Sequence, residues 1–414
     1  CPLRSPEREK TACERHRDSV QTASSSSSVF SFLRPRPVAG GYVPQCARHG
    51  AYEPTQCHAA VGQCWCVDAS GQEVPNTRTG PGSTPLCIDQ AVTPAPVGPT
   101  PRPGVRPLPR EHTCCSLERG KIELVPLDGD NIRKEDARPL LQTPDRVVIA
   151  VGYDCVDKMV YWTDITGPSI SRASLTGGDI VPVITTELQS PEGIAIDHVA
   201  RLLFWTDSMR DTVEVSKLDG SQRRVLFDTD LINPRPIVTN PAYGRLYWAD
   251  WDRDSPKIEM SNMDGTDRTV LVKDDLGLPN GLTFDLEDQQ LCWADAGTRK
   301  VECMDPHRRL RRRIVAGIQY PFALVALGGK LYYTDWRREA VVSVDRHSEK
   351  ETEEFLPQKR SRLYGITTTP SRCPQVYNYC LDNGGCSHLC LPRLGGFTCR
   401  CPDAAAGRCV ETTP

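Results

Sequence analysis

A short phrase ending in Asp recurs five times in the middle of the chain. Successive copies are 43, 43, 45 and 40 residues apart and occupy residues 161–164, 204–207, 247–250, 292–295 and 332–335. Short apolar runs precede the copies, and several copies are followed by an Asp-Gly turn such as Asp219-Gly220. Units of about forty residues built from short β-branched and aromatic runs are typical of four-stranded propeller blades. The repeat therefore predicts a mainly β fold organised as a β-propeller.

Two tallies of the expected strands both give six blades. Innermost strands are expected at residues 147–154, 193–197, 236–240, 281–285, 322–327 and 364–369. Second strands are expected at the five phrases and at a divergent copy, residues 113–116, which leads into 121–124. The earliest of the expected second strands, at residues 113–116, has no innermost strand before it. The last expected innermost strand, at residues 364–369, has no second strand after it. One blade must therefore combine both ends of the repeat region, which closes the ring and removes free sheet edges.

Cysteine usage indicates an oxidising compartment. Of the 19 cysteines, seven lie in residues 1–87 and seven in residues 373–409, while the long middle has five. Dense cysteines at both ends suit small modules that need cross-links to be stable. Zinc knuckles would require CxxC pairs with histidines at ligand spacing, and the sequence has none. We therefore expect a secreted, disulfide-bonded protein.

Composition shifts divide the chain into five expected segments. These are the remnant of an upstream segment (1–12), a cysteine-rich module (13–87), a proline-rich linker (88–112), the propeller (113–372) and a second cysteine-rich module (373–414). Seven prolines in the linker favour an extended polyproline conformation. The net charge of −3 predicts no nucleic-acid partner, and no apolar run approaches the roughly 20 residues of a membrane span.

The modules resemble known families. The recurring phrases resemble the YWTD repeats of the low-density-lipoprotein-receptor class B family, whose members fold as six-bladed propellers often followed by an EGF-like module. The cysteine spacing around Asn383-Gly384-Gly385-Cys386 resembles such an EGF-like module. Gln56-Cys57 and Cys64-Trp65-Cys66-Val67 resemble the signature of a thyroglobulin type-1 domain. This order of modules is similar to the C-terminal region of the nidogen (entactin) family of basement-membrane linkers.

The resemblances imply a disulfide pairing for the two terminal modules. The thyroglobulin type-1 family implies Cys13–Cys46, Cys57–Cys64 and Cys66–Cys87, and the EGF-like family implies Cys380–Cys390, Cys386–Cys399 and Cys401–Cys409. Two further bridges are candidates because of their places in the repeat: Cys292–Cys303 on consecutive strands, and Cys155–Cys373 at the two ends of the ring. The residues left over are Cys1, whose partner is expected upstream, and Cys114 and Cys115, for which a strained vicinal bond is one option.

The nidogen resemblance implies that the propeller binds an EGF-like module of the laminin γ-chain short arm through the face around its axis. The residue before the small residue of each innermost strand is expected at the rim of that face, which selects Glu192, Arg235, Asn280, Phe322 and Tyr364. Tyr, Phe and Arg are enriched among interface anchors. The alternative is that blade geometry alone places these residues at loop starts. A second set is either a contact surface or stacking within the blade, and comprises Trp251, Arg253, Trp336 and Arg337.

Residues that recur in the phrases are expected to be structural. A metal or catalytic ring is the alternative for Asp164, Asp207, Asp250, Asp295 and Asp335, but a residue repeated in every blade more often accepts the same backbone N–H bonds. Blade packing is the expected role of Trp162, Trp205, Trp248 and Trp293.

A dense basic run lies between the fifth and sixth phrases when the divergent copy is counted first. It contains Arg308, Arg309, Arg311, Arg312 and Arg313. A solvated loop between two blades is the default expectation for such a run. The alternatives are a binding site for heparan sulfate and a cleavage site for a basic-site protease.

Two other functions compete with that of a matrix linker. One is a lipoprotein-receptor-like ectodomain fragment, although complement-type ligand repeats are absent from this sequence. The other is cysteine-protease inhibition by the thyroglobulin type-1 module. Catalysis is not expected, because the channel mouth offers only Glu192 and no Ser-His-Asp set. We expect no metal site, no cofactor and no calcium in the EGF-like module, and a protein that is not an enzyme. The nidogen resemblance implies that the protein is located in the basement membrane.

Overall fold

The computed structural model describes residues 10–25, 42–47, 50–58, 60–67, 70–73, 77–79, 85, 87, 113–118, 120–129, 131–357, 361–405 and 407–413. The chain divides into two compact units, one formed by residues 1–105 with 375–377 and the other by residues 106–374 with 378–414. Cys1 and the whole proline-rich linker expected at 88–112 lie outside the described residues.

The first unit is a small fold held by disulfides. Cys13–Cys46 ties helix α1 (Ala12–Ser25) to the segment before the hairpin of β1 (Thr55–His58) and β2 (Gln63–Cys66). Cys57–Cys64 links the two strands of the hairpin, and Cys66–Cys87 fixes its end. Gln56 on β1 is fully buried, and its amide nitrogen donates to the carbonyls of Gln45 and Glu53. A buried amide must find such partners, so this side chain helps to define the module.

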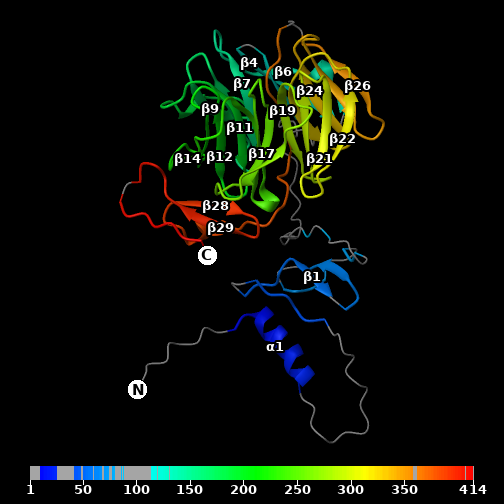
Figure 1. Ribbon diagram of the computed structural model, residues 1–414, viewed down its shortest axis with the longest axis vertical. Coiled ribbons are helices and arrows are strands. Elements are labelled where there is room, and N and C mark those ends of the chain that lie inside the picture. Colours follow the sequence, from blue (N-terminus) through cyan, green and yellow to red (C-terminus); the bar gives the residue numbers. More distant parts are fainter. Residues whose placement is uncertain are drawn as a thin grey trace, which may run out of the picture. The chain divides into compact units, whose positions relative to one another are not determined.

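The second unit contains a six-bladed β-propeller (Figure 1). Five blades are four-stranded antiparallel sheets of consecutive strands, each with its innermost strand first. The first three are β7 (Val148–Asp154), β8 (Met159–Asp164), β9 (Ser169–Ser174) and β10 (Val181–Ile184); β11 (Pro191–Asp197), β12 (Leu202–Asp207), β13 (Thr212–Lys217) and β14 (Arg224–Phe227); and β15 (Pro234–Asn240), β16 (Arg245–Asp250), β17 (Lys257–Asn262) and β18 (Thr269–Val272).

The ring continues through two more such blades and closes with the sixth. The next two are β19 (Pro279–Asp285), β20 (Gln290–Asp295), β21 (Lys300–Asp305) and β22 (Leu310–Ala316); and β23 (Pro321–Leu327), β24 (Lys330–Asp335), β25 (Ala340–Asp345) and β26 (Lys350–Phe355). In the closing blade the last strand of the propeller pairs with the first. It comprises β27 (Ile366–Thr369), β3 (Thr113–Glu118), β4 (Lys121–Asp128), β5 (Asn131–Ile132) and β6 (Arg138–Gln142), with the 3-10 turn η1 (Lys134–Asp136) between β5 and β6. The predicted six-bladed ring is confirmed.

The recurring phrases form the second strands β8, β12, β16, β20 and β24. Their tryptophans Trp205, Trp248 and Trp293 are fully buried, and Trp162 nearly so. Trp248 shares a hydrophobic cluster with Phe204 of the preceding blade, and Phe227 stacks on it with ring centroids 5.1 Å apart. Because such clusters lie between neighbouring sheets, these aromatic side chains pack one blade against the next.

The Asp at the end of each phrase accepts hydrogen bonds that join two parts of its blade. Asp295 accepts from the backbone N–H groups of Gly277 and Leu278, before the innermost strand, and of Gly297 and Thr298, after the second strand. Equivalent backbone bonds reach Asp207, Asp250 and Asp335, while Asp164 binds the Thr166 backbone and the Arg146 side chain. These carboxylates are therefore occupied by structural hydrogen bonds.

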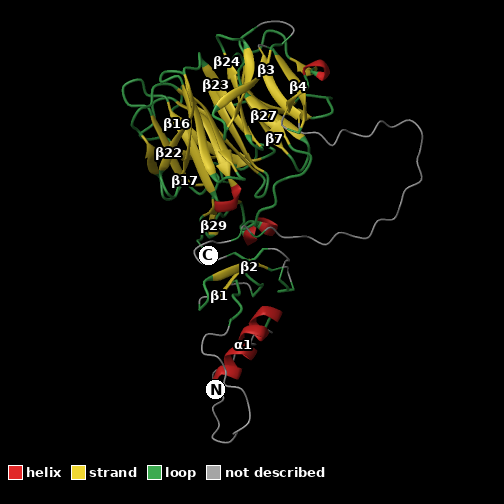
Figure 2. Cartoon of the chain, turned by 90° about the vertical axis from the view of Figure 1, so that its right-hand side faces the viewer, coloured by secondary structure: helices red, strands yellow, loops and turns green. Residues whose placement is uncertain are grey.

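The EGF-like module packs directly on the propeller (Figures 1 and 2). It consists of the 3-10 turn η3 (Leu381–Gly385) and the hairpin of β28 (Leu389–Arg393) and β29 (Gly396–Arg400), with the bridges Cys380–Cys390, Cys386–Cys399 and Cys401–Cys409. Leu389 and Leu391 join the hydrophobic cluster that contains Leu246 of β16. The module contacts the propeller near the short 3-10 turn η2 (Pro241–Tyr243), where the innermost strand β15 ends.

Two disulfides lie in the propeller itself. Cys155–Cys373 joins the turn after β7 to the segment after β27, and Cys292–Cys303 bridges the neighbouring strands β20 and β21. The first bridge spans 218 residues of sequence and links the two ends of the ring. Among the described residues, no helix is long and apolar enough to cross a membrane.

Two expectations from the sequence differ from the structure. Three innermost strands begin two residues earlier than expected, at Pro191, Pro234 and Pro279, and the last one begins two residues later, at Ile366. The basic run was expected in a loop between blades, but it forms a hairpin turn and the outermost strand β22 of one blade. Ile314 is buried at the end of this run, so the strand is anchored by its apolar end despite its charge.

Candidate functional site: the axial hollow of the propeller

A β-bulge occurs near the start of the innermost strand in five blades. Each of these strands pairs its first residue with the phrase Asp, as in Pro191 with Asp207, and the register then shifts. The shifts fall at residues 191–193, 234–237, 279–281, 321–324 and 148–151. Bulges re-aim side chains, and the residues in these bulges include Glu192, Arg235, Asn280 and Phe322.

The bulged residues surround a hollow at the propeller axis. All six innermost strands or their starting residues line it, and its volume is about 80 Å³. Glu192, Arg235, Asn280 and Phe322 supply its polar and aromatic groups, while the remaining lining is apolar or glycine. The structure thus places four of the five predicted rim residues around the hollow, whereas the fifth, Tyr364, does not line the hollow itself.

Glu192 and Arg235 form an ion pair across two neighbouring blades. The Arg235 Nη1 atom lies 2.8 Å from Glu192 Oε2, and the two side chains are 25% and 12% exposed. The hydroxyls of Ser190 and Ser208 donate to the other carboxylate oxygen at 2.9 and 2.7 Å. Burial lowers the pKa of Arg235 because it disfavours the charged guanidinium. The positive charge of Arg235 is therefore already paired with a carboxylate within the protein.

Trp251 lies beneath this ion pair. The Arg235 guanidinium carbon sits 4.0 Å from the centroid of the Trp251 ring, a cation–π distance. Trp251 is half-buried, and its Nε1 atom is buried without a hydrogen-bond partner among the described residues. Trp251 therefore positions Arg235, while Arg253, two residues further on, is exposed.

The opposite side of the hollow carries an aromatic cluster of Tyr320, Phe322, Trp336 and Tyr364. Trp336 stacks between Phe322 and Tyr320, with ring centroids at 4.6 and 5.4 Å. Tyr364 meets both Phe322 and Trp336 edge-on at 5.5 Å, and Trp336 Nε1 donates to the Leu363 carbonyl at 2.7 Å. All four rings are half-buried. Stacking within the propeller and exposure at the face therefore coexist in this cluster.

Asn280 lies in the bulge between these two groups. Its side-chain nitrogen donates to the Pro321 carbonyl at 3.0 Å, which ties β19 to the start of β23. Arg337 follows Trp336 and is exposed. The structure thus brings Glu192, Arg235, Asn280, Phe322, Tyr364, Trp251 and Trp336 to one face, with Arg253 and Arg337 in the turns beside it.

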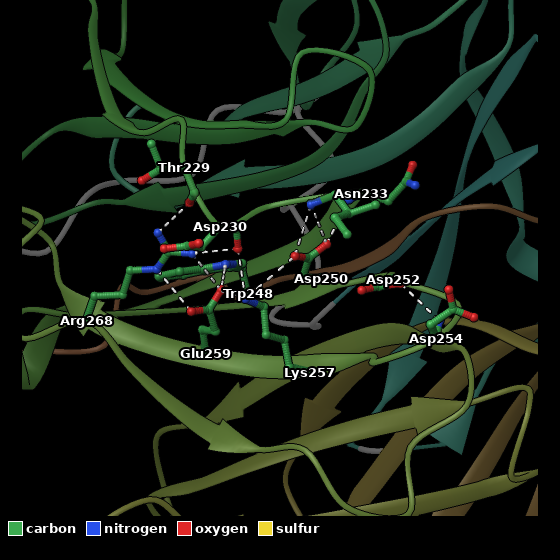
Figure 3. Close-up of polar contacts among 11 residues, drawn as sticks. Thr229, Asp230, Asn233, Trp248, Asp250, Asp252, Asp254, Lys257, Glu259 and Arg268 are labelled. Carbon is green, nitrogen blue, oxygen red and sulfur yellow. Dashed lines mark hydrogen bonds and ion pairs between the residues drawn. The ribbon is translucent and has the colours of Figure 1, made fainter.

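An arginine clamp supports the loop before Arg235 (Figure 3). Arg268 donates to both oxygens of Glu259 at 3.0 Å and to the carbonyls of Thr229 and Asp230 at 2.8 and 3.1 Å. Its guanidinium carbon lies 5.6 Å from the Trp248 ring centroid. Two sister blades repeat this arrangement with Arg223 and Glu214 on Trp205, and with Arg311 and Glu302 on Trp293.

Sequence reasoning missed the clamp and several residues of the hollow. The clamp has a sequence signal, because Glu precedes Arg by nine residues in all three blades. A proline begins four innermost strands and marks the bulge that follows it. No comparable signal distinguishes Ser190, Ser208, Tyr320 or Arg362, which touch the site only through the folded chain.

The hollow offers recognition groups rather than a reactive constellation. Glu192 is the single carboxylate among the described residues that line it. The described residues contain one cluster of three His, Cys or acidic side chains close enough to share a metal ion, namely Cys155, His198 and Cys373. The two cysteines of that cluster form a disulfide, so they do not offer thiolates.

Comparisons with known proteins agree with this architecture. The thyroglobulin type-1 repeat model matches residues 13–87, and the low-density lipoprotein receptor repeat class B model matches residues 158–198, 201–238 and 244–286. Human nidogen-1 is 60% identical over 405 residues, which cover 97% of this chain and 32% of that protein. Nidogen of Drosophila melanogaster is 42% identical over 302 residues, covering 71% of this chain and 22% of the relative.

A solved structure is also similar to this chain. The crystal structure of a nidogen/laminin complex contains a chain that is 53% identical, with a TM-score of 0.62, covering 63% of this chain and 100% of that one. The chain spans about a third of the length of the human nidogen-1 that it matches. With its module order, its propeller and these identities, the chain belongs to the nidogen family.

Proposed function

We propose that this chain is part of a secreted basement-membrane linker whose propeller binds an EGF-like module of the laminin γ-chain short arm. The partner docks on the axial face, over the hollow formed by the bulges of the innermost strands. The similarity to a nidogen chain solved in a nidogen/laminin complex supports the choice of partner. Surfaces of the chain outside the axial face, including those of the terminal modules, are then available to bind further matrix components.

The size and chemistry of the hollow carry the proposal. At about 80 Å³ it is smaller than the roughly 300–1,000 Å³ of small-molecule pockets, and it suits one protruding side chain of a protein partner. Glu192 and Arg235 together present an acceptor and a donor side by side. An amide side chain on the partner can donate to Glu192 and accept from Arg235, whereas a carboxylate on the partner is repelled by Glu192. The half-buried aromatic cluster then buries an apolar flank of the same loop.

The axial face acts by binding rather than by catalysis. Its ionic groups are neutralised by each other, and its carboxylate is held by two serine hydroxyls and a guanidinium. This arrangement is pre-organised, so little side-chain entropy is lost when a partner docks. A fixed, mixed polar and aromatic surface of this kind favours protein recognition.

Surface plasmon resonance tests the proposal. The whole chain is passed over an immobilised laminin γ1 short-arm fragment, alongside Arg235→Ala, Phe322→Ala and the control Arg372→Ala, whose side chain is exposed in the segment after β27. Anchor residues cost about 2 kcal/mol or more when truncated, which is roughly thirtyfold in Kd. We expect such a loss in the first two variants and wild-type binding in the control.

The possible outcomes distinguish the identity of the partner from the location of its binding site. Binding that survives both truncations would retain laminin as partner and refute the axial face as its site. An absence of binding by the wild-type chain at micromolar concentration would refute laminin as partner. Circular dichroism of each variant checks that the propeller remains folded.

A further inference from the structure

The outermost strand β22 differs from its counterparts in the sister blades. The arginine clamp provides an internal alignment, because Arg223, Arg268 and Arg311 perform the same task in three blades. Two residues after the clamp arginine, the sister blades have Val225 and Val270, whereas β22 has Arg313. The hairpin turn before β22 contains His307, Arg308 and Arg309, where the sister turns contain Asp219-Gly220-Ser221 and Asp264-Gly265-Thr266. Of the five arginines in the basic run (308, 309, 311, 312 and 313), the blade architecture therefore requires one, the clamp residue Arg311.

Two of the five arginines contact other residues of the propeller, although Arg312 is itself 48% exposed. Arg311 pairs with Glu302 and donates to the carbonyls of Asp274 and Asp275. Arg312 turns towards the next blade, where it donates to the Arg346 carbonyl at 3.2 Å and lies 3.9 Å from Glu349. These contacts explain why a strand with so many charges is still held in the blade.

Three arginines remain at the surface. Arg308 is 78% exposed and has one carboxylate, Asp305, at 3.6 Å. Arg309 and Arg313 are exposed, and no carboxylate among the described residues lies within ion-pair distance of either one. Exposed arginines without acidic partners leave a local excess of positive charge, although the whole chain is slightly acidic at −3.

We propose that β22 and its hairpin turn bind a sulfated polysaccharide of the heparan sulfate class. The chemistry is that of an extended polyanion lying along an edge strand, with its sulfates paired to Arg308, Arg309 and Arg313. Guanidinium groups bind sulfate and phosphate oxygens in bidentate geometry and are weakly hydrated, so they give up water readily. The disulfide-bonded, extracellular character of the chain makes a matrix polyanion the fitting occupant rather than a nucleic acid.

This surface is separate from the axial hollow. The hollow is lined by residues at the start of β19, the innermost strand of the same blade, whereas β22 is that blade's outermost strand. The proposal therefore does not depend on laminin binding. A competing role for the arginines is to prevent edge-to-edge pairing of an exposed strand, as charged residues do in many sheets.

The experiment measures binding of the whole chain to immobilised heparin as sodium chloride is raised. The test variant is Arg309→Asn/Arg313→Val. It restores the valine of the sister blades, and it places Asn at position 309, where φ is +55° and Asn is tolerated. The matched control is Arg372→Asn/Arg408→Val, which removes the same charge from two other exposed positions.

We expect the test variant to bind at least about tenfold more weakly at 0.15 M salt, and its slope of log affinity against log salt to fall by about two. The control keeps wild-type affinity, laminin binding is unchanged in both variants, and fully desulfated heparin does not bind. Equal weakening of both variants, or no weakening of the test variant, overturns the proposal. Stronger binding to phosphatidylserine vesicles than to heparin overturns it in favour of a membrane surface. Aggregation of the test variant with unchanged heparin binding assigns the arginines to edge protection.

Discussion

Gly244 of the propeller lies against the backbone of Arg393 in the EGF-like module. A β-carbon placed on Gly244 would be 2.7–2.8 Å from the N, Cα and C atoms of Arg393, closer than any side chain permits. Beside this contact, the Thr398 hydroxyl donates to the buried Asp264 carboxylate at 2.6 Å. These contacts lie at the end of β15, whereas Arg235 lies at its start, so the module covers the end of the propeller away from the axial hollow.

Replacing Gly244 by alanine should loosen the EGF-like module. Gly244 has a left-handed φ of +58°, which costs an L-residue about 1–2 kcal/mol, and the new methyl group clashes with backbone that has no flexible side chain to move. The matched control is Gly265→Ala, which has φ of +84° but meets its nearest atom at 3.7 Å. Hydrogen exchange should show lost protection in β28 and β29 for Gly244→Ala alone. Similar protection in both variants would contradict the proposed contact.

The arginine clamp should contribute strongly to stability. Arg268→Met removes the fork that serves Glu259, Thr229 and Asp230 and leaves the 3%-exposed Glu259 with Lys257 at 3.5 Å as its remaining cation. Breaking a buried pair costs about 3–5 kcal/mol, and the nearby Lys257 favours the lower end. Guanidinium unfolding measures the loss. The control Arg313→Met, which breaks no described ion pair, should stay within about 0.5 kcal/mol of wild type.

The ring could be predicted from sequence because its signal is repeated. Five copies of one phrase give the period, and each buried Trp and hydrogen-bonded Asp does the same task in its blade, so an error in one copy is corrected by the others. The closing blade followed from counting alone. Four residues at the rim of the hollow could be predicted for the same reason, because they occupy one position of the repeat: Glu192, Arg235, Asn280 and Phe322.

Other features of the site depend on contacts that do not repeat. Arg235 was expected at the rim, but its pairing with Glu192 from the preceding blade was not predicted. Such pairing joins residues 43 positions apart, and no local pattern encodes it. The basic run was placed in a loop because charge density alone predicts solvent, whereas the buried Ile314 and the ladder to β21 hold it in a strand.

Asp197 should tolerate an amide where Asp207 does not. Asp197 Oδ1 accepts from the backbone of Val199 and Ala200, but its Oδ2 is buried without a partner among the described residues. Both oxygens of Asp207 accept backbone N–H groups, including those of Gln189 and Ser190. Asp207→Asn should therefore lose about 1–3 kcal/mol at neutral pH, because an amide nitrogen then faces a buried N–H. Asp197→Asn should be at least as stable as wild type.

The difference in stability between wild type and Asp197→Asn should change with pH in a direction that can be predicted. Burial raises the pKa of Asp197 above its usual value, so the folded state binds its proton more tightly than the unfolded state does. This contribution is present at low pH and is lost as pH rises through the raised folded pKa. Wild type should therefore gain stability relative to Asp197→Asn as pH falls from 7 towards 4. Urea unfolding at several pH values measures the difference, and a gain in the opposite direction would refute the assignment.

The disulfide that closes the ring should stabilise the propeller more than the one within a blade. Cys155–Cys373 spans 218 residues and Cys292–Cys303 spans 11, so the loop-entropy relation gives about 5 and about 3 kcal/mol respectively. The double variants Cys155→Ala/Cys373→Ala and Cys292→Ala/Cys303→Ala are compared by guanidinium unfolding under oxidising conditions. We expect the first to lose about 2.5 kcal/mol more than the second. A disulfide stabilises a fold by reducing the conformational freedom of the unfolded chain. Equal losses would therefore mean that β27 and β3, which pair in the folded state, stay close together in the unfolded chain as well.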